Sequence, residues 1–175
     1  MATYHASITD EQAALIRNAR LFFVATADAN LASGPGDVGP VNVSPKGGVP
    51  LHILGPNRVA YLDYRGSGNE TARHCAMAGP ITVMICSFEE NDAAIVRLFG
   101  KASVTPLADS PLAELLLQRP ARELTGSARQ VIEITVESTM TSCGYGTPVM
   151  QFVRDRRVVD RGRRYKEKKA DRATA

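Results

Sequence analysis

Apolar runs rich in β-branched and aromatic residues recur along the chain and predict a mainly β protein. The first, LFFVATA at residues 21–27, is apolar along almost its whole length, which is typical of a buried strand. Further strands are predicted at residues 41–45, 50–54, 57–64, 81–88, 94–107 and 128–143. The acidic turn EENDA between two of these runs indicates an antiparallel hairpin. Because few helices interrupt the strands, we expect a mainly β (α+β) fold, a small antiparallel barrel of about six strands with peripheral helices.

Three segments have the capping signals of helices. In residues 7–20, Thr9 stands in the N-cap position and Gln12 follows three residues later, as a capping box requires. Residues 70–78 follow an asparagine that suits an N-cap, and a Gly-Pro pair after them should end the helix. Residues 109–118 begin with Asp-Ser-Pro, in which Asp or Ser caps the helix and proline takes its first position.

The charge is unevenly distributed and divides the chain into two parts. Residues 1–153 contain 11 Lys or Arg and 14 Asp or Glu, whereas residues 154–175 contain 10 and 4, so the net charges are −3 and +6. The chain has 175 residues, 44% of them hydrophobic, which suits one compact domain. We therefore expect one domain at 1–153 and a basic C-terminal tail at 154–175. The interspersed acids of the tail favour a solvated terminus over a nucleic-acid-binding arm.

The sequence lacks the signals of membrane insertion and of metal or disulfide cross-links. No run approaches the roughly 18 to 20 apolar residues of a membrane span, and the N-terminus does not resemble a signal peptide. These absences predict a cytoplasmic protein. Cys75, Cys86 and Cys143 are far apart, so they are expected to be small buried residues. The three histidines show no metal-ligand spacing, and no metal site is predicted.

The segment YRGSGNETARH at residues 64–74 is a candidate seat for a phosphate. Gly66 and Gly68 allow a tight bend that brings backbone N–H groups close to a ligand, and Ser67 and Asn69 add side-chain donors. A helix beginning just after them would direct its first unpaired N–H groups at the same loop. The alternative is an ordinary strand-to-helix turn with Asn69 as a plain N-cap.

A second candidate, VNVSPKGG at residues 41–48, places a hydroxyl and an ammonium group at the end of a strand. Ser44, Pro45 and Lys46 precede two glycines that let the chain turn away. Lys46 is the only lysine before Lys101, and an isolated cation beside glycines suits an anionic ligand. A solvated lysine at the barrel rim is the alternative.

Five segments occur in an order and spacing that match a known family. They are FFVATADANLASGPGDVGPVNVSPKGG, VAYLDYRGSGNETARH, ITVMICSF, IVRLFGKA and SCGYGTPVM. Together they resemble a branch of the pyridoxamine 5′-phosphate oxidase-like family, the FMN-binding split barrels, over roughly residues 20–153. The resemblance implies a six-stranded antiparallel split β-barrel that works as a homodimer, with FMN bound at the dimer interface.

The resemblance also implies which residues contact FMN. The strand matching VNVSPK would line the flavin ring and its phosphate side, and the next strand end and loop would complete the phosphate and ribityl site. The implied contacts are Val43, Ser44, Lys46, Tyr61, Asp63, Ser67, Gly68 and Asn69.

Two residues later in the chain are further candidates. Arg97 falls in the strand that crosses toward the partner's flavin in the family, so it could anchor flavin or substrate, although it also suits the wet face of a strand. Tyr145, between two glycines, could stack near the flavin or donate a proton to the substrate, and the alternative is a tyrosine that lines a turn.

The sequence departs from the true oxidases at the phosphate site and at the C-terminus. Gly68 and Asn69 replace the Arg-Lys pair of those enzymes, so Arg65 or Arg73 would have to supply the charge. Arg73 could equally form a surface pair with Glu70, three residues earlier on the same helix. The chain also lacks Trp and the C-terminal substrate motif, which argues against pyridoxine phosphate as its substrate.

The resulting functional hypothesis is an FMN-dependent oxidoreductase that exchanges a hydride with an unidentified small molecule, with NAD(P)H as a candidate electron donor. One alternative is a flavin-binding carrier or sensor without turnover. Another is a related protein that binds deazaflavin or haem in place of FMN. The last is a nucleic-acid binder, which only the basic tail supports.

Overall fold

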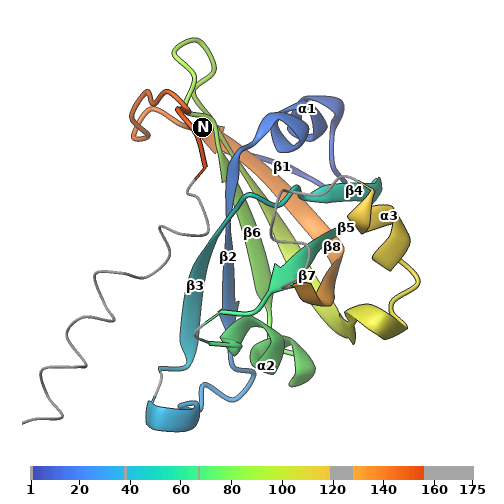
Figure 1. The fold of residues 1–175 in the computed structure, drawn as a ribbon. Helices are drawn as coiled ribbons and strands as arrows, with labels where there is room; N and C mark the ends of the chain where they lie inside the picture. The colour runs from blue at the N-terminus through green and yellow to red at the C-terminus, as the bar shows by residue number, and fades with distance from the viewer. Residues whose placement is uncertain (1, 38, 67, 119–127, 156–175) are drawn as a thin grey trace, which may run out of the picture.

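The computed structural model describes residues 2–37, 39–66, 68–118 and 128–155, which form one curved antiparallel sheet with helices at its margins (Figure 1). The described strands are β1 (Thr3–His5), β2 (Leu21–Ala27), β3 (Val41–Gly47), β4 (His52–Gly55), β5 (Arg58–Tyr64), β6 (Ile81–Cys86), β7 (Ala94–Pro106) and β8 (Ala128–Cys143). The described helices are α1 (Asp10–Asn18), α2 (Glu70–Ala76) and α3 (Ala113–Leu117). None of these helices is long and apolar enough to cross a membrane.

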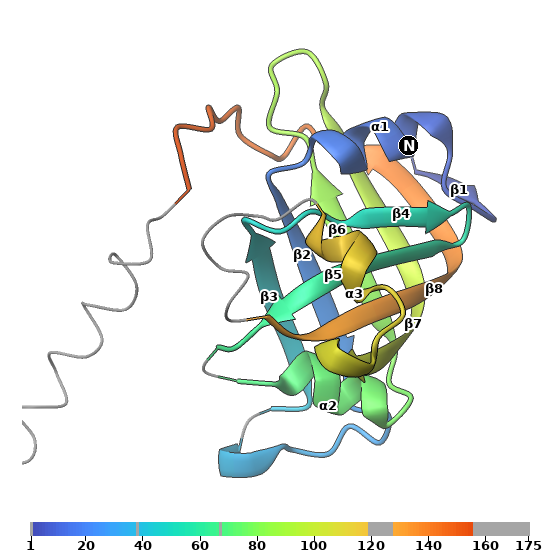
Figure 2. The same ribbon diagram turned by 45° about the vertical axis from the view of Figure 1, so that its right-hand side comes forward.

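The strands follow the order β3-β2-β6-β7-β8-β5-β4 across the sheet. Strand β8 is long enough to pair with β7 along one side, and with β5 and then β1 along the other. The sheet curls around the core but remains open, because no pairing in the described part of the chain joins β3 to β4 or β5 (Figure 2). The opening between β3 and β5 is called the split below.

The expected mainly β architecture with peripheral helices is confirmed, and so is the β6–β7 hairpin. The expected number of about six strands is wrong, since the described sheet has eight. Strand β1 is only three residues long, with the sequence TYH, so it carries no periodic apolar signal. The third helix also begins later than expected, at Ala113, because Leu107–Asp109 forms a 3-10 turn first.

Buried and partly exposed side chains alternate along the strands, and the buried ones form a main core inside the curled sheet. Phe22 and Val24 of β2 are 2% and 0% exposed, whereas their neighbours Phe23 and Ala25 are only partly buried on the outer side. Strand β5 is buried on both faces, because Val59 and Tyr61 face the main core while the intervening residues pack beneath α3. This second cluster consists of Ala60, Leu62, Leu116 and Val131.

The first helix begins as the sequence predicts. The Thr9 N–H donates to Gln12 Oε1 at 3.1 Å, and the Gln12 N–H donates to Thr9 Oγ1 at 3.3 Å, which completes the capping box. Gln12 is 1% exposed, and its Nε2 also donates to Thr141 Oγ1 of β8 at 2.9 Å. The same side chain therefore caps α1 and anchors it to the sheet.

Gly100 allows two long strands to stay paired through a bulge. The β7–β8 register shifts between Phe99 and Gly100, and a Cβ atom at Gly100 would lie 2.0 Å from the carbonyl oxygen of Thr135. The contact is to backbone, which has little room to move, so the close approach of the strands requires glycine here.

We expect Gly100→Ala to lower the free energy of unfolding by about 1–3 kcal/mol, because the methyl group forces β7 and β8 apart. Urea denaturation followed by circular dichroism measures this change. Gly146→Ala is the matched control, since nothing lies within 4 Å of a Cβ atom at that turn residue. Equal unfolding midpoints for the two variants would contradict the packing argument.

Candidate functional site

The polar side chains of β3 line the split, because alternate residues of this edge strand point to opposite faces. Phe22 is paired with Lys46 and Val24 with Ser44, and directly opposed residues share a face. Since Phe22 and Val24 point into the core, Ser44 and Lys46 point to the inner side as well. Val43 points outward and is 65% exposed, so the structure separates it from the other two predicted residues of this strand.

Asp63 of β5 lies at the centre of a polar cluster in the split. Its Oδ1 accepts from Lys46 Nζ at 3.0 Å, across from β3. Its Oδ2 accepts from Arg129 Nη2 at 2.8 Å and Nε at 3.0 Å, and from Gln130 Nε2 at 2.8 Å. These four residues, Lys46, Asp63, Arg129 and Gln130, are called the Asp63 cluster.

The Asp63 cluster carries a net positive charge that ligands can reach. Burial acts most strongly on Asp63 and would raise its pKa, but the charge of Lys46 and the hydrogen bonds from Lys46, Arg129 and Gln130 outweigh burial and lower it. The Asp63 side chain is 6% exposed, whereas those of Lys46 and Arg129 are 18% and 23% exposed. One ionised carboxylate therefore holds two cations at the edge of the split.

Tyr61 lies beneath this cluster in the main core and is fully buried. The Lys46 Nζ atom is 5.7 Å from the centroid of its ring, and the Phe22 ring packs edge-on at 5.3 Å. Among the described residues its hydroxyl has no hydrogen-bond partner, and burial raises its pKa well above the usual 10.0. Tyr61 is therefore a core residue that keeps its hydroxyl proton, and its ring packs beneath the Lys46 ammonium group.

The loop between β5 and α2 is tied to the start of β8. Gln130 Nε2 donates to Asn69 Oδ1 at 3.0 Å, and Arg129 Nη2 donates to the Gly68 carbonyl at 3.1 Å. Asn69 stands at the N-cap position of α2 but makes no side-chain cap, so the plain N-cap alternative does not describe its side chain. Ser67, the other predicted donor of this loop, lies outside the described residues.

Glu70 introduces a negative charge beside the same loop. A Cβ atom at Gly68 would lie 2.2 Å from Glu70 Oε2, so the carboxylate occupies the space that a side chain there would fill. The carboxylate is the far end of a flexible side chain and can move aside, but where it lies here a phosphate bound at this loop would meet it.

Arg73 belongs to a separate buried network under α2. Its Nη1 donates to Asp28 Oδ2 at 3.1 Å, and its Nη2 lies 2.8 Å from His74 Nε2. Because arginine can only donate, His74 accepts through Nε2 and its Nδ1–H donates to Thr26 Oγ1 at 2.9 Å. Burial and the Arg73 charge lower the pKa of His74, which agrees with this neutral form. The predicted surface pair of Arg73 with Glu70 is replaced by the Asp28 ion pair.

The remaining predicted residues lie away from the Asp63 cluster. Arg97 is on the outer side of β7, opposite Met84 and Met140, and its Nη1 donates to Ser142 Oγ at 3.1 Å. Tyr145 is 91% exposed in the turn after β8. Of the predicted set, the described structure brings together Lys46, Asp63, Gly68 and Asn69 above the buried Tyr61.

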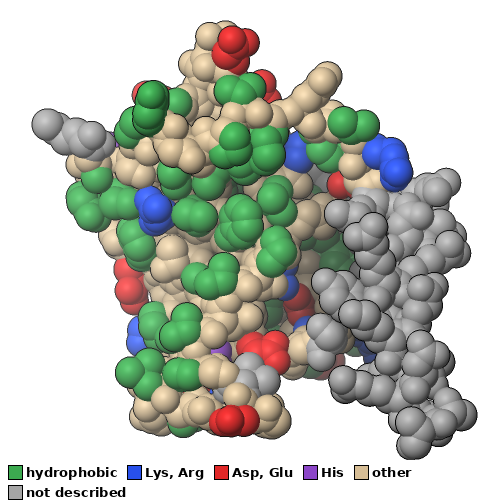
Figure 3. Space-filling model, turned by 90° about the vertical axis from the view of Figure 1, so that its left-hand side faces the viewer, with side chains coloured by type: hydrophobic (Ala, Val, Ile, Leu, Met, Phe, Trp, Pro, Cys, Tyr) green, Lys and Arg blue, Asp and Glu red, His purple; other side chains and the backbone are tan. Residues whose placement is uncertain are grey.

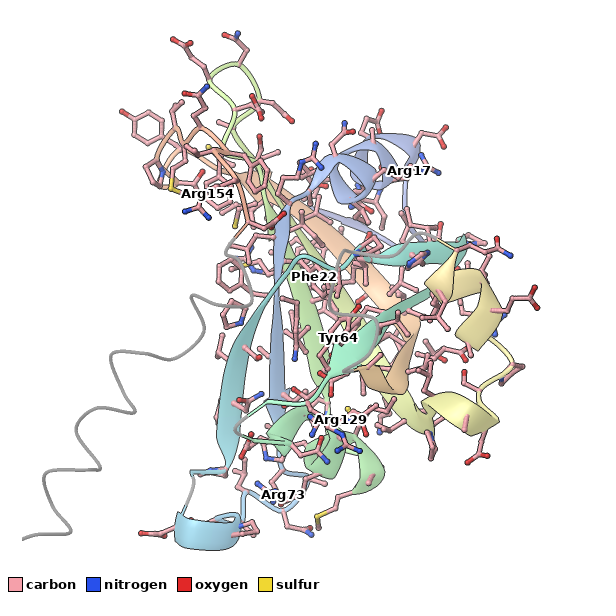
Figure 4. All side chains as sticks on the ribbon, viewed as in Figure 1. Arg17, Phe22, Tyr64, Arg73, Arg129 and Arg154 are labelled. Carbon is pink, nitrogen blue, oxygen red and sulfur yellow. The ribbon has the colours of Figure 1, made fainter. Side chains whose placement is uncertain are left out.

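Sequence reasoning missed Arg129, which is labelled in Figure 4, and Gln130. These two residues supply most of the donors to Asp63. They stand at the start of a predicted strand, where polar residues are common. The signal that could have identified them is the pairing of Asp63 with Gln130 across β5 and β8, which local sequence patterns do not specify.

The outer side of the sheet carries apolar residues that no element covers in the described structure. Hydrophobic side chains gather on the side of the molecule shown in Figure 3. Along the strands, the outward positions include Val41, Val43, Phe23, Met84, Phe99 and Met140, which we call the outer sheet face. Val41 and Val43 are 62% and 65% exposed.

The cysteines and the acidic residues give no indication of a metal centre in the described parts of the chain. No group of three or more His, Cys, Asp or Glu side chains there could hold a metal ion. Cys75 and Cys86 are buried as expected, and the expectation for Cys143 is wrong, since it is exposed at the end of β8.

Comparison with known proteins identifies a relative. No protein-family model matches the chain. Over 158 residues it is 35% identical to a protein of Aspergillus flavus named pyridoxamine 5′-phosphate oxidase family protein ustO, a match that covers 89% of this chain. This chain is a homologue of a pyridoxamine 5′-phosphate oxidase family protein. It spans 59% of the length of that relative.

Solved structures share the fold of this chain. A candidate pyridoxamine 5′-phosphate oxidase of Lactobacillus delbrueckii matches with a TM-score of 0.55 at 22% identity, over 77% of this chain and 94% of that one. HupZ of Group A Streptococcus matches at 0.55 and 24% identity, over 74% and 90%. An FMN-binding protein of Syntrophomonas wolfei matches at 0.50 and 12% identity, over 81% and 90%.

We expect Asp63→Asn to destabilise the protein by about 1–3 kcal/mol at neutral pH, because Lys46 and Arg129 lose their shared counter-charge. Asp63 has a pKa below its ordinary value of 3.8, so its ionised form stabilises the fold above that pH. As the pH falls below about 3.8, wild-type Asp63 takes up a proton and the difference between the two proteins should shrink. Denaturant titrations at several pH values measure it.

Glu133→Gln is the matched control for Asp63→Asn. It removes an exposed ion pair with Arg58, whose side chain is 53% exposed, so it should cost less than about 1 kcal/mol. A destabilisation by Asp63→Asn that stays constant down to pH 2 would contradict the assigned role of the carboxylate.

Proposed function

We propose that the chain binds FMN at the split and uses it to oxidise or reduce a small organic molecule. The observation that carries this proposal is the pair of cations held by Asp63 at an accessible edge of the barrel. Homology to a pyridoxamine 5′-phosphate oxidase family protein and the fold shared with the FMN-binding protein of Syntrophomonas wolfei support it.

The chemistry of the Asp63 cluster fits the phosphate of FMN. A phosphate dianion prefers charged donors, which the Lys46 ammonium and the forked Arg129 guanidinium provide. The Asn69 amide, whose oxygen already accepts from Gln130, adds a neutral N–H donor beside them. Arg129 supplies the charge for which Arg65 or Arg73 was predicted, since Arg73 is already paired with Asp28.

The residues of the chain would act mainly by positioning. Asp63 fixes Lys46 and Arg129 before a ligand arrives, so less conformational entropy is lost when the phosphate binds. Ser44, which lies on the same face of β3 as Lys46, is the further donor on this strand. The bound flavin would supply hydride transfer, while the protein orients it and shields it from water.

The proposal includes a homodimer that forms through the outer sheet face. An uncovered apolar sheet face is typical of an interface, and one cation, Arg97, stands within it. Val43 and Arg97 point away from the Asp63 cluster of their own chain, so they would reach FMN only across such an interface. This arrangement gives both predicted residues a role toward the flavin bound by the partner.

We expect the purified protein to retain FMN after excess ligand is removed, and Lys46→Ala combined with Asn69→Ala to weaken binding by about tenfold or more. A hydrogen bond to a charged group contributes about 1.5–3 kcal/mol, and 1.4 kcal/mol corresponds to tenfold. Riboflavin, which lacks the phosphate, should lose less affinity. Visible absorption and flavin fluorescence titrations measure both ligands.

Three comparisons decide this assignment. Lys101→Ala removes an exposed lysine outside the split and should leave FMN affinity unchanged. Glu70→Gln should strengthen FMN binding but not riboflavin binding, because it removes the carboxylate beside Gly68. Unaltered FMN affinity in the folded double variant would overturn the phosphate assignment. Failure of the wild-type protein to bind FMN would overturn the proposal that FMN is its cofactor. Bleaching of the bound flavin by NADH or NADPH would separate an oxidoreductase from a carrier.

We expect the protein to be a dimer in solution and Val43→Glu to convert it into a monomer, because the interface would then bury an unpaired carboxylate. Light scattering coupled to size-exclusion chromatography measures the mass. Leu115→Glu is the matched control, since Leu115 is also exposed but lies on α3. A monomeric wild-type protein, or equal masses for both variants, would argue against this interface.

A further inference from the structure

A cavity lies at the end of the barrel that carries α1. It has a volume of about 590 Å³ and three walls. They are α1, the β6–β7 hairpin with its connecting loop, and the segment 150–152 after β8. Small-molecule sites typically occupy 300–1,000 Å³, so the cavity is large enough for a ligand of two fused rings.

The walls are held in place by contacts within the chain. The Met150 N–H donates to the Phe88 carbonyl at 3.0 Å, which fixes the C-terminal segment against the hairpin. The Arg20 guanidinium lies over the Phe152 ring, 5.4 Å from its centroid. On the opposite wall, α1 is anchored through Gln12 to Thr141. These contacts leave the cavity formed without any ligand, as small-molecule sites usually are.

The lining combines an apolar interior with an acidic rim. Leu15, Leu21, Phe88, Ala94 and Val96 contribute apolar surface. The charged lining residues are three carboxylates, from Glu11, Glu89 and Asp92, and one guanidinium, from Arg20.

Among the described residues, the lining carries three carboxylates against one guanidinium, so its net charge is negative. No ion pair of Glu11, Glu89 or Asp92 occurs within the described residues, while the Arg20 cation is engaged with the Phe152 ring. The loop carries a further acid, Glu90, which does not line the cavity. A ligand with an apolar body and a positive charge would complement both parts of the lining, whereas an anion would be repelled.

We propose that this cavity binds a small organic amine, with its aromatic or aliphatic body inside and its ammonium group at the acidic rim. The site is distinct from the one proposed for FMN. It shares no lining residue with the Asp63 cluster and has the opposite charge, so it does not depend on the chain being a flavoprotein.

The test compares three indole probes that share a ring system and differ in charge. They are tryptamine, which is cationic, 3-ethylindole, which is neutral, and indole-3-propionate, which is anionic. Calorimetric titration of the full chain, with amide chemical-shift mapping by NMR, should show tryptamine binding at least tenfold more tightly than indole-3-propionate. The shifts should centre on Leu15, Phe88 and Ala94.

Variants of the rim and the interior separate the two parts of the proposal. Glu89→Gln combined with Asp92→Asn changes only exposed residues and should weaken tryptamine about three- to tenfold without affecting 3-ethylindole. Glu90→Gln is the matched control and should leave the affinities for tryptamine and 3-ethylindole unchanged. Ala14 is an exposed residue of α1 that lines the cavity. Ala14→Trp should fill the cavity and lower the affinity for both tryptamine and 3-ethylindole.

Each outcome of these titrations either supports or overturns the amine site. Selective binding of tryptamine that is lost in the rim variant supports the amine site, and unchanged FMN binding in that variant shows that the two sites are separate. Failure of tryptamine to bind, equal binding of all three probes, or equal effects of the rim variant and Glu90→Gln would overturn the proposal.

Discussion

The Lys46–Asp63 ion pair, supported by Arg129, bridges the part of the barrel that backbone hydrogen bonds leave open. In the described chain no strand pairing crosses the split, yet Lys46 of β3 and Arg129 of β8 both bind the same carboxylate of β5. A buried carboxylate is tolerated only when charged partners offset its lost hydration. The same arrangement presents two partly exposed cations to an anion, so the support of the split and the proposed ligand site depend on one residue.

Much of the fold could be predicted from local patterns. Strand β2, the Thr9–Gln12 capping box and the β6–β7 hairpin follow from apolar periodicity, capping chemistry and turn composition, which act over a few residues. Strand β1 could not be predicted, because its three residues form a strand only by pairing with β8, more than 130 positions away in the sequence. Such pairing is a property of the folded chain.

The site shows the same division between local and distant causes. Lys46 and Asn69 were predicted because an isolated cation and a glycine-rich loop are visible in the sequence. Arg129 was not, since its role depends on the register between β5 and β8. Arg73 was misassigned for a related reason, because its partner Asp28 lies 45 residues earlier, beyond the helical spacing that suggested Glu70.

Pro45 has a consequence for how copies of this chain can meet. Strand β3 ends the sheet, and the free edge of such a strand ordinarily offers a row of donors and acceptors to any other extended segment. Proline lacks the N–H group, and Lys46 next to it carries a charge, so continuous edge-to-edge pairing along β3 is interrupted. Growth into open-ended, sheet-extended aggregates is thereby blocked at this edge, while closed association through the face of the sheet remains available.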